Sequence, residues 1–154
     1  MKIKFLIPIT FLFLCFGCSV DSNDNTQDFK QETAQIFQWH LINVSGGFVG
    51  VDIDYDMDTI IWVFNVDSVG SGSIEIQNNN TDDTLEDAFD TGVYSVSIPV
   101  YDAQSILFVN GDEFAGVLTP TDDDLVLNTN ITSRGNIGSD GFVYTFKRKV
   151  IIVN

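Results

Sequence analysis

The chain has only two cysteines, Cys15 and Cys18, and both lie within the first 18 of its 154 residues. The sequence after them therefore has no thiol that could form a disulfide, hold a metal or act as a nucleophile. The single histidine, His40, excludes a metal site built from several histidines. A domain without disulfides depends on its apolar core for stability.

Basic residues are also scarce, with seven Lys and Arg against 22 Asp and Glu and a formal net charge of −15. All 22 acidic residues follow Cys18, where the opposing basic residues are Lys30, Arg134, Lys147, Arg148 and Lys149. Such a surface repels phosphate backbones and anionic headgroups. We therefore expect no nucleic-acid partner.

After residue 18, helical periodicity is absent except between Asp28 and Phe37, where we expect a weak helical turn leading into the first strand. Short runs of β-branched and aromatic residues instead alternate with clusters of Gly, Asn and Asp. These runs predict strands at residues 37–44, 48–54, 59–66, 73–77, 92–98, 105–109, 113–118, 125–129 and 141–148.

The spacing of these runs, close to one strand per twelve residues, is typical of all-β domains. Ile60, Trp62 and Phe64 share one face of their strand, because side chains alternate along a strand. Connections such as Asn110-Gly111 have the length and composition of hairpin turns. We therefore expect an antiparallel up-and-down meander of eight or nine strands that closes into a barrel, which removes exposed strand edges.

The first 17 residues have the layout of a secretory signal, with Lys2 and Lys4 followed by an apolar run from Phe5 to Phe16. A helix of about twelve residues reaches roughly 18 Å, well short of the ~30 Å hydrocarbon core of a bilayer. The run is therefore too short for a comfortable transmembrane span.

The end of this run, Leu14-Cys15-Phe16-Gly17-Cys18, resembles the lipobox of bacterial lipoproteins. The resemblance implies a signal peptide of residues 1–17, a lipid such as palmitate-bearing diacylglycerol on Cys18, an acidic flexible tether at 18–34 and a folded domain at 35–154. Ser19 and the acidic tether resemble signals that send lipoproteins to the outer membrane. We expect lipid anchoring in a Gram-negative cell envelope, at the outer membrane and facing the periplasm or the surface.

The sequence from about Ile36 to Val150 resembles a lipocalin-like domain of the calycin type. The matching features are Trp39 in the first strand, the Gly46-Gly47 turn, the strand at 59–64, Gly92-Val93-Tyr94 and the last strand at 141–148. The resemblance implies that Trp39 packs near a basic residue of the last strand, here Arg148, and closes one end of the barrel.

The same resemblance implies that the barrel binds a small apolar ligand. The residues that would line this site are Trp62, Phe64, Tyr94, Phe108, Phe142, Tyr144 and Phe146. The residues themselves leave an alternative open, because side chains can fill small barrels completely. The chain would then be a structural or interaction module of the envelope that binds a protein or glycan through its acidic loops.

Asp52, Asp54, Asp56 and Asp58 alternate with apolar residues and form a weak calcium candidate. A helix-loop-helix calcium loop that began at Asp52 would need glycine and glutamate where Met57 and Val63 stand. A strand with an acidic solvent face is the favoured interpretation. We otherwise expect no metal and no cofactor.

The longest break between predicted strands, residues 78–90, contains Leu85 and Phe89, which are apolar enough to cover a barrel end. A simple solvated connection is the favoured interpretation, and a lid is the alternative. Acid–base catalysis by two carboxylates needs a pocket that raises the pKa of one of them, and the sequence indicates that every acidic cluster is exposed. We therefore do not expect an enzyme.

Overall fold

The computed structural model describes residues 34–136 and 140–153. The predicted signal peptide, Cys18 and almost all of the predicted tether lie outside these residues. Residues Glu32–Asn154 form one compact unit. None of the described residues forms a helix that is long and apolar enough to cross a membrane.

All regular structure in the described residues is β. The strands are β1 (Ala34–Gly46), β2 (Val51–Asp54), β3 (Ile60–Val66), β4 (Ser71–Asn78), β5 (Gly92–Ser97), β6 (Val100–Tyr101), β7 (Gln104–Val109), β8 (Asp112–Thr121), β9 (Asp124–Asn128), β10 (Ile131–Thr132), β11 (Gly135–Asn136) and β12 (Phe142–Val153).

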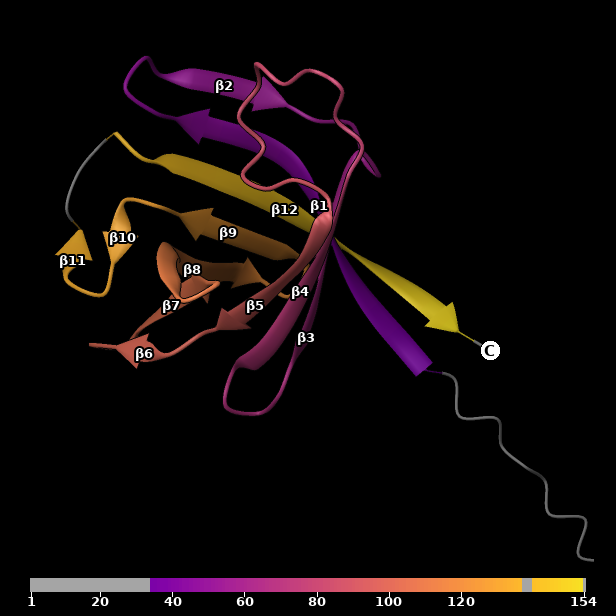
Figure 1. Ribbon diagram of the computed structural model, residues 1–154, viewed down its shortest axis with the longest axis vertical. Helices are drawn as coiled ribbons and strands as arrows, with labels where there is room; N and C mark the ends of the chain where they lie inside the picture. The colour runs from indigo at the N-terminus through magenta and orange to yellow at the C-terminus, as the bar shows by residue number, and fades with distance from the viewer. Residues whose placement is uncertain (1–33, 137–139, 154) are drawn as a thin grey trace, which may run out of the picture. The chain divides into compact units, whose positions relative to one another are not determined.

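The strands form an antiparallel barrel. Its order is β12-β9-β8-β7-β5-β4-β3-β1, and β1 pairs in turn with β12, so that eight strands close on themselves (Figure 1). β2 pairs with β1 outside this ring, β6 pairs with β7, and β10 and β11 form a separate two-stranded sheet. The predicted fold class, an all-β up-and-down meander closed into a barrel, is confirmed.

The first and last strands make the longest pairing, from Ala34 opposite Val153 to Gly46 opposite Phe142. On its other edge, β1 pairs with β3 only at Trp39 and His40, and with β2 further along. β1 therefore closes the barrel by pairing with β12, and it also pairs with β2 outside the ring. Its first five residues extend beyond the pairing with β3.

Three details differ from the sequence-based expectation. Residues 34–37 belong to β1 and are not helical, because they pair with β12. The second strand begins at Val51, because Gly46, Gly47 and Gly50 all have positive φ and make a turn with Phe48 at its tip. Consecutive strands do not always pair, since β2 and β3 both pair with β1.

The predicted turn between β7 and β8 is confirmed. Asn110 (φ 53°) and Gly111 (φ 89°) connect the two strands. Two successive positive φ angles are typical of the type I′ turn, whose twist matches that of the flanking strands. The local sequence therefore sets the register of this hairpin.

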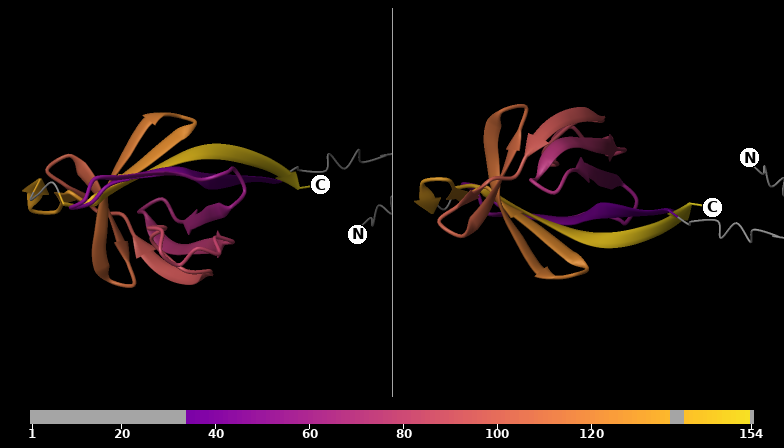
Figure 2. Two further views of the ribbon diagram at one scale, coloured as in Figure 1. Left: turned by 90° about the horizontal axis from the view of Figure 1, so that it is seen from above. Right: turned by 90° about the horizontal axis from the view of Figure 1, so that it is seen from below.

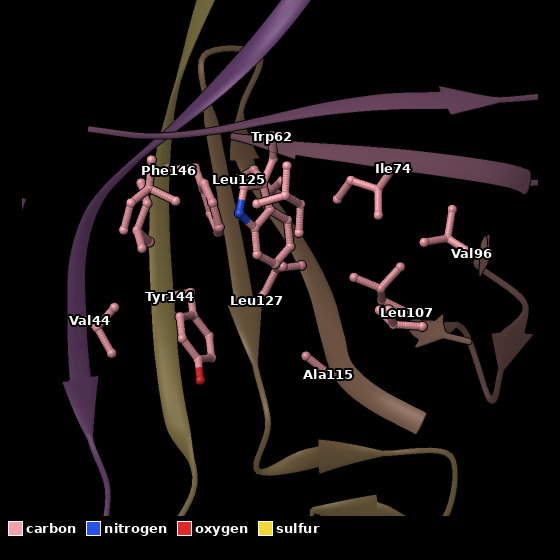
Figure 3. Packing of buried hydrophobic residues seen from close by; sticks show 14 of the residues in the cluster. Val44, Trp62, Ile74, Val96, Leu107, Ala115, Leu125, Leu127, Tyr144 and Phe146 are labelled. Atoms are coloured by element: carbon pink, nitrogen blue, oxygen red, sulfur yellow. The ribbon is translucent and has the colours of Figure 1, made fainter. Parts of the chain in front are cut away.

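Alternate side chains of the barrel strands point inward and form the core (Figure 3). The buried apolar cluster comprises Leu41, Val44, Tyr55, Ile60, Trp62, Ile74, Ile76, Val96, Leu107, Val109, Ala115, Leu125, Leu127, Tyr144 and Phe146. Burial of one large apolar side chain contributes about 1.5–3 kcal/mol. Because every member lies between Leu41 and Phe146, the unit from Glu32 to Asn154 contains its own core.

Candidate functional site

Aromatic rings fill the middle of the barrel. Trp62 is fully buried, and its ring centroid lies 4.9 Å from that of Phe146, 5.8 Å from that of Phe89 and 6.4 Å from that of Phe114. These tilted contacts are favourable aromatic geometries. The middle of the barrel is therefore occupied by the protein's own side chains.

The loop between β4 and β5, residues 79–91, closes one end of the barrel, and we call it the lid. It lies at the end where β3 begins, because the Asn79 N–H donates to the Thr59 carbonyl. Phe89 inserts from the lid and packs against Phe114 and Tyr94, at centroid distances of 4.9 and 5.3 Å. Leu85 is exposed, so Phe89 fills the lid role and Leu85 does not.

Glu86 fastens the lid to the barrel. The Tyr144 hydroxyl donates to Glu86 Oε1 at 2.7 Å, and the Tyr55 hydroxyl donates to the Glu86 backbone carbonyl at 2.8 Å. Burial raises the pKa of Tyr55 to about 12 and moves the pKa of Tyr144 well above its ordinary value. Both hydroxyls therefore stay protonated and donate throughout the neutral range.

The opposite end of the barrel contains an apolar hollow of about 140 Å³, which we call the mouth hollow. Its lining residues are Trp39, Phe64, Val66, Ile98, Val117, Leu125 and Leu127. A protein cavity of about 150 Å³ can hold benzene, whereas sites for drug-sized ligands occupy about 300–1,000 Å³. The mouth hollow therefore fits a benzene-sized molecule or one end of a longer apolar molecule.

The seven residues predicted to line a ligand site divide into three groups. Phe64 lines the mouth hollow. Phe108 corrects the prediction, because its neighbours Leu107 and Val109 point into the core while Phe108 lies beside Tyr101 of β6. The other five pack within or against the core: Trp62, Tyr94, Phe142, Tyr144 and Phe146.

Of the seven residues that line the mouth hollow, only Phe64 was predicted to line a ligand site. Leu125 and Leu127 alternate in β9, which indicates that both point inward. Ile98, just after β5, and Val117, in the middle of β8, are brought together only in the closed barrel. Alternation could identify inward residues, but it could not identify the end of the barrel that stays unfilled.

Trp39 and Arg148 are direct partners across β1 and β12. The guanidinium of Arg148 lies 5.3 Å from the ring centroid of Phe37, and its Nη2 donates to Asp123 Oδ1 at 2.8 Å. The predicted contact between an aromatic ring and a guanidinium is therefore made with Phe37, while Trp39 lines the mouth hollow.

The four alternating aspartates do not converge on one point. Asp52 and Asp54 both accept hydrogen bonds from the Asn43 amide, at 2.8 and 3.0 Å. Asp58 instead accepts from Lys149 Nζ at 2.8 Å, on the far side of β1. Among the described residues, no three metal-binding side chains come together, so the geometry does not support the calcium candidate formed by Asp52, Asp54, Asp56 and Asp58.

His40 is buried on the outer side of β1, beneath the turn that contains Asp58. Its Nδ1 accepts the Asp58 backbone N–H at 3.2 Å, which requires an unprotonated Nδ1. Burial lowers the pKa of His40, and this effect outweighs the Asp58 carboxylate, which favours the charged ring. Lys149 lowers the pKa further. The folded protein therefore holds His40 neutral.

We expect the free energy of unfolding to fall as pH decreases from 7.5 to 5.5. The unfolded chain protonates His40 near its ordinary pKa of about 6.5, while the folded protein resists that proton, so acid favours unfolding. Urea denaturation at several pH values measures the loss. His40→Gln removes the titrating group, and its free energy of unfolding should be nearly constant over this range. Equal pH slopes for the two proteins would contradict the assignment.

We expect Tyr144→Phe to lower the free energy of unfolding by about 1–3 kcal/mol, because Glu86 loses its hydroxyl donor. Amide exchange of Ala88 and Phe89 should also accelerate as the lid opens more often. The control, Tyr101→Phe, alters an exposed ring and should stay within about 0.5 kcal/mol of the wild type. Unchanged lid exchange in Tyr144→Phe would contradict the fastening role of Glu86.

Comparison with known proteins identifies no relative of this chain. No family model matches the chain, and neither the curated proteins nor the solved structures yield a match. The fold therefore rests on strand order and register, and the candidate site rests on the mouth hollow and the lid.

Proposed function

We propose that this protein is a lipid-anchored envelope lipoprotein whose lipocalin-like barrel binds a small apolar molecule in the mouth hollow. The observation that carries the proposal is a hollow of about 140 Å³ whose seven lining residues are all apolar. Burial of apolar ligand surface at such a site is favourable, by about 25 cal/mol per Å². The binding requires no catalytic group, and we infer that the protein is not an enzyme.

Size limits the ligand. Because the aromatic rings around Trp62 and Phe89 fill the rest of the barrel, the ligand reaches only the end opposite the lid. The favoured ligands are compact apolar rings, or longer apolar chains that insert one end.

Membrane attachment follows from the Leu14-Cys15-Phe16-Gly17-Cys18 sequence. Two or more acyl chains on one residue anchor stably, whereas a single chain anchors marginally. In this proposal, Cys18 holds the barrel at the outer membrane of a Gram-negative envelope, and the acidic residues after it form a solvated tether.

The second candidate function is a barrel filled by its own side chains that acts as a structural or interaction module. The packing of Trp62 against four other aromatic rings favours it. The acidic loops would then bind an envelope protein or a glycan. Ligand binding at the mouth hollow separates the two candidates.

We expect Cys18→Ser to abolish lipid attachment. In a Gram-negative host supplied with labelled palmitate, the wild type should carry label and pellet with membranes, because Cys18 is the acylated residue. Cys15→Ser is the matched control and should keep the label, since Cys15 lies in the removed peptide. Label retained by Cys18→Ser would refute the anchor.

We expect a chain that starts at Ser19 to bind the neutral apolar probe N-phenyl-1-naphthylamine and to transfer excitation from Trp39 to it. Val117→Phe places a larger side chain in the mouth hollow and should weaken binding at least about tenfold, or about 1.4 kcal/mol. Val93→Phe enlarges an exposed residue of β5 and should leave binding unchanged. Absence of probe binding, or equal affinity of the two variants, would exclude the ligand site and favour the filled module.

A further inference from the structure

The paired ends of β1 and β12 project from the barrel as a two-stranded ribbon (Figures 1 and 2). We call residues 34–38 of β1 and 149–153 of β12 the arm. β3 pairs with β1 only at Trp39 and His40, so it does not reach the arm. β9 pairs with β12 as far as Lys147, and the Arg148 N–H donates to the Asp123 carbonyl. Within the described part of the chain, neither outer edge of the arm has a neighbouring strand.

Both faces of the arm are apolar. Phe37 lies opposite Val150 and Ile36 lies opposite Ile151, on alternate faces of the ribbon. The exposed fractions are 46% for Phe37, 44% for Val150 and 62% for Ile152. A two-stranded ribbon with an apolar surface is marginally stable in water by itself. The arm therefore gains stability if a further strand covers it.

Basic residues 147–149, where the arm leaves the barrel, are each paired with an aspartate, and the rest of the arm carries no charge. Lys147 is paired with Asp124, Arg148 with Asp123, and Lys149 with Asp58. Residues 150–153, Val-Ile-Ile-Val, and residues 34–38, Ala-Gln-Ile-Phe-Gln, carry no charge. Edge strands are normally protected by charged residues or proline. In a chain with a net charge of −15, the arm is a place where a second copy can approach without direct repulsion.

The two edges of the arm differ in access. The β1 edge faces the β3–β4 hairpin across a groove lined in part by Ile36, Gln38, Ile61 and Val63. The β12 edge extends past the β8–β9 hairpin, whose Asp123 and Asp124 pair with Arg148 and Lys147, just before the arm. The β12 edge is therefore the more accessible one.

We propose that the arm is a dimerisation surface, on which the β12 edges of two copies pair antiparallel. A twofold axis at Ile151 places Val150 opposite Ile152 of the second copy, and Lys149 opposite Val153, so that no like charges face each other. The four-stranded sheet β1-β12-β12-β1 then satisfies the free N–H and C=O groups of both edges. A lipid surface fits less well, because hydrocarbon leaves those groups unpaired.

Sedimentation equilibrium of the chain from Ser19 tests the pairing. Only a short strand is added, so we expect a weak dimer with a Kd of about 10–100 µM. Ile152→Lys places two lysines within the shared sheet and should raise the Kd at least about tenfold. Val49→Lys makes the same change at an 82% exposed residue of the β1–β2 turn and should leave the Kd unchanged. A wild type that is monomeric at about 200 µM, or equal weakening by both lysines, would overturn the proposal.

A second variant tests the pairing without relying on Ile152. The chain from Ser19 has no cysteine, so Ile151→Cys introduces a single thiol at the proposed twofold axis. Side chains directly opposite each other have Cβ atoms about 4.5–5.5 Å apart, close to the spacing that a disulfide needs. Mild oxidation should therefore link Ile151→Cys into a covalent dimer much faster than the control Val49→Cys. Equal rates of crosslinking would contradict the β12 pairing.

Discussion

The pairing of the first and last strands is the contact on which the rest of the structure depends. β1 and β12 stand at opposite ends of the folded chain, and their register runs from Ala34 and Val153 to Gly46 and Phe142. Until they pair, the meander is an open sheet whose two edge strands are exposed and whose core is incomplete. Because their pairing closes the longest loop in the domain, we expect it to be costly in conformational entropy and slow to form. No disulfide assists this step in the described residues, so the apolar core must compensate.

Much of this barrel could be predicted from local pattern alone. Alternation identifies the inward faces of β3 and β12. Trp62 belongs to a series of apolar residues at every second position of β3, and Phe146 belongs to such a series in β12. Asn110-Gly111 identifies its own turn, because both residues tolerate positive φ. These signals depend only on neighbours in sequence. They are sufficient for the nine longer strands and for the closed meander, whereas the two-residue strands β6, β10 and β11 were not predicted.

The remaining features depend on contacts between residues far apart in sequence. β2 pairs with residues 43–46 of β1 and β3 with Trp39 and His40, and no local signal predicts that both strands pair with β1. Residues 106–109, Ile-Leu-Phe-Val, are all apolar, so alternation alone does not decide which of them point inward. The closed barrel places Leu107 and Val109 in the core and leaves Phe108 outside it. The mouth hollow is lined by residues of several strands that lie far apart in sequence, and whether it fills depends on packing that alternation does not describe. The Tyr144–Glu86 contact spans 58 residues and likewise lacks a sequence signature.

The inserted ring of Phe89 occupies the space that a ligand would need at the lidded end of the barrel, so the lid competes with any ligand there. A ligand that entered from the lidded end would first have to displace this ring from Trp62 and Phe114. The hydrogen bond from Tyr144 to Glu86 opposes that displacement. The apparent affinity at that end is the intrinsic affinity multiplied by the fraction of molecules in which the lid is open. A closed state favoured by about 2.8 kcal/mol weakens such binding about 100-fold. The two ends of the barrel therefore differ, because the Phe89 ring occupies one end and the apolar mouth hollow lies at the other.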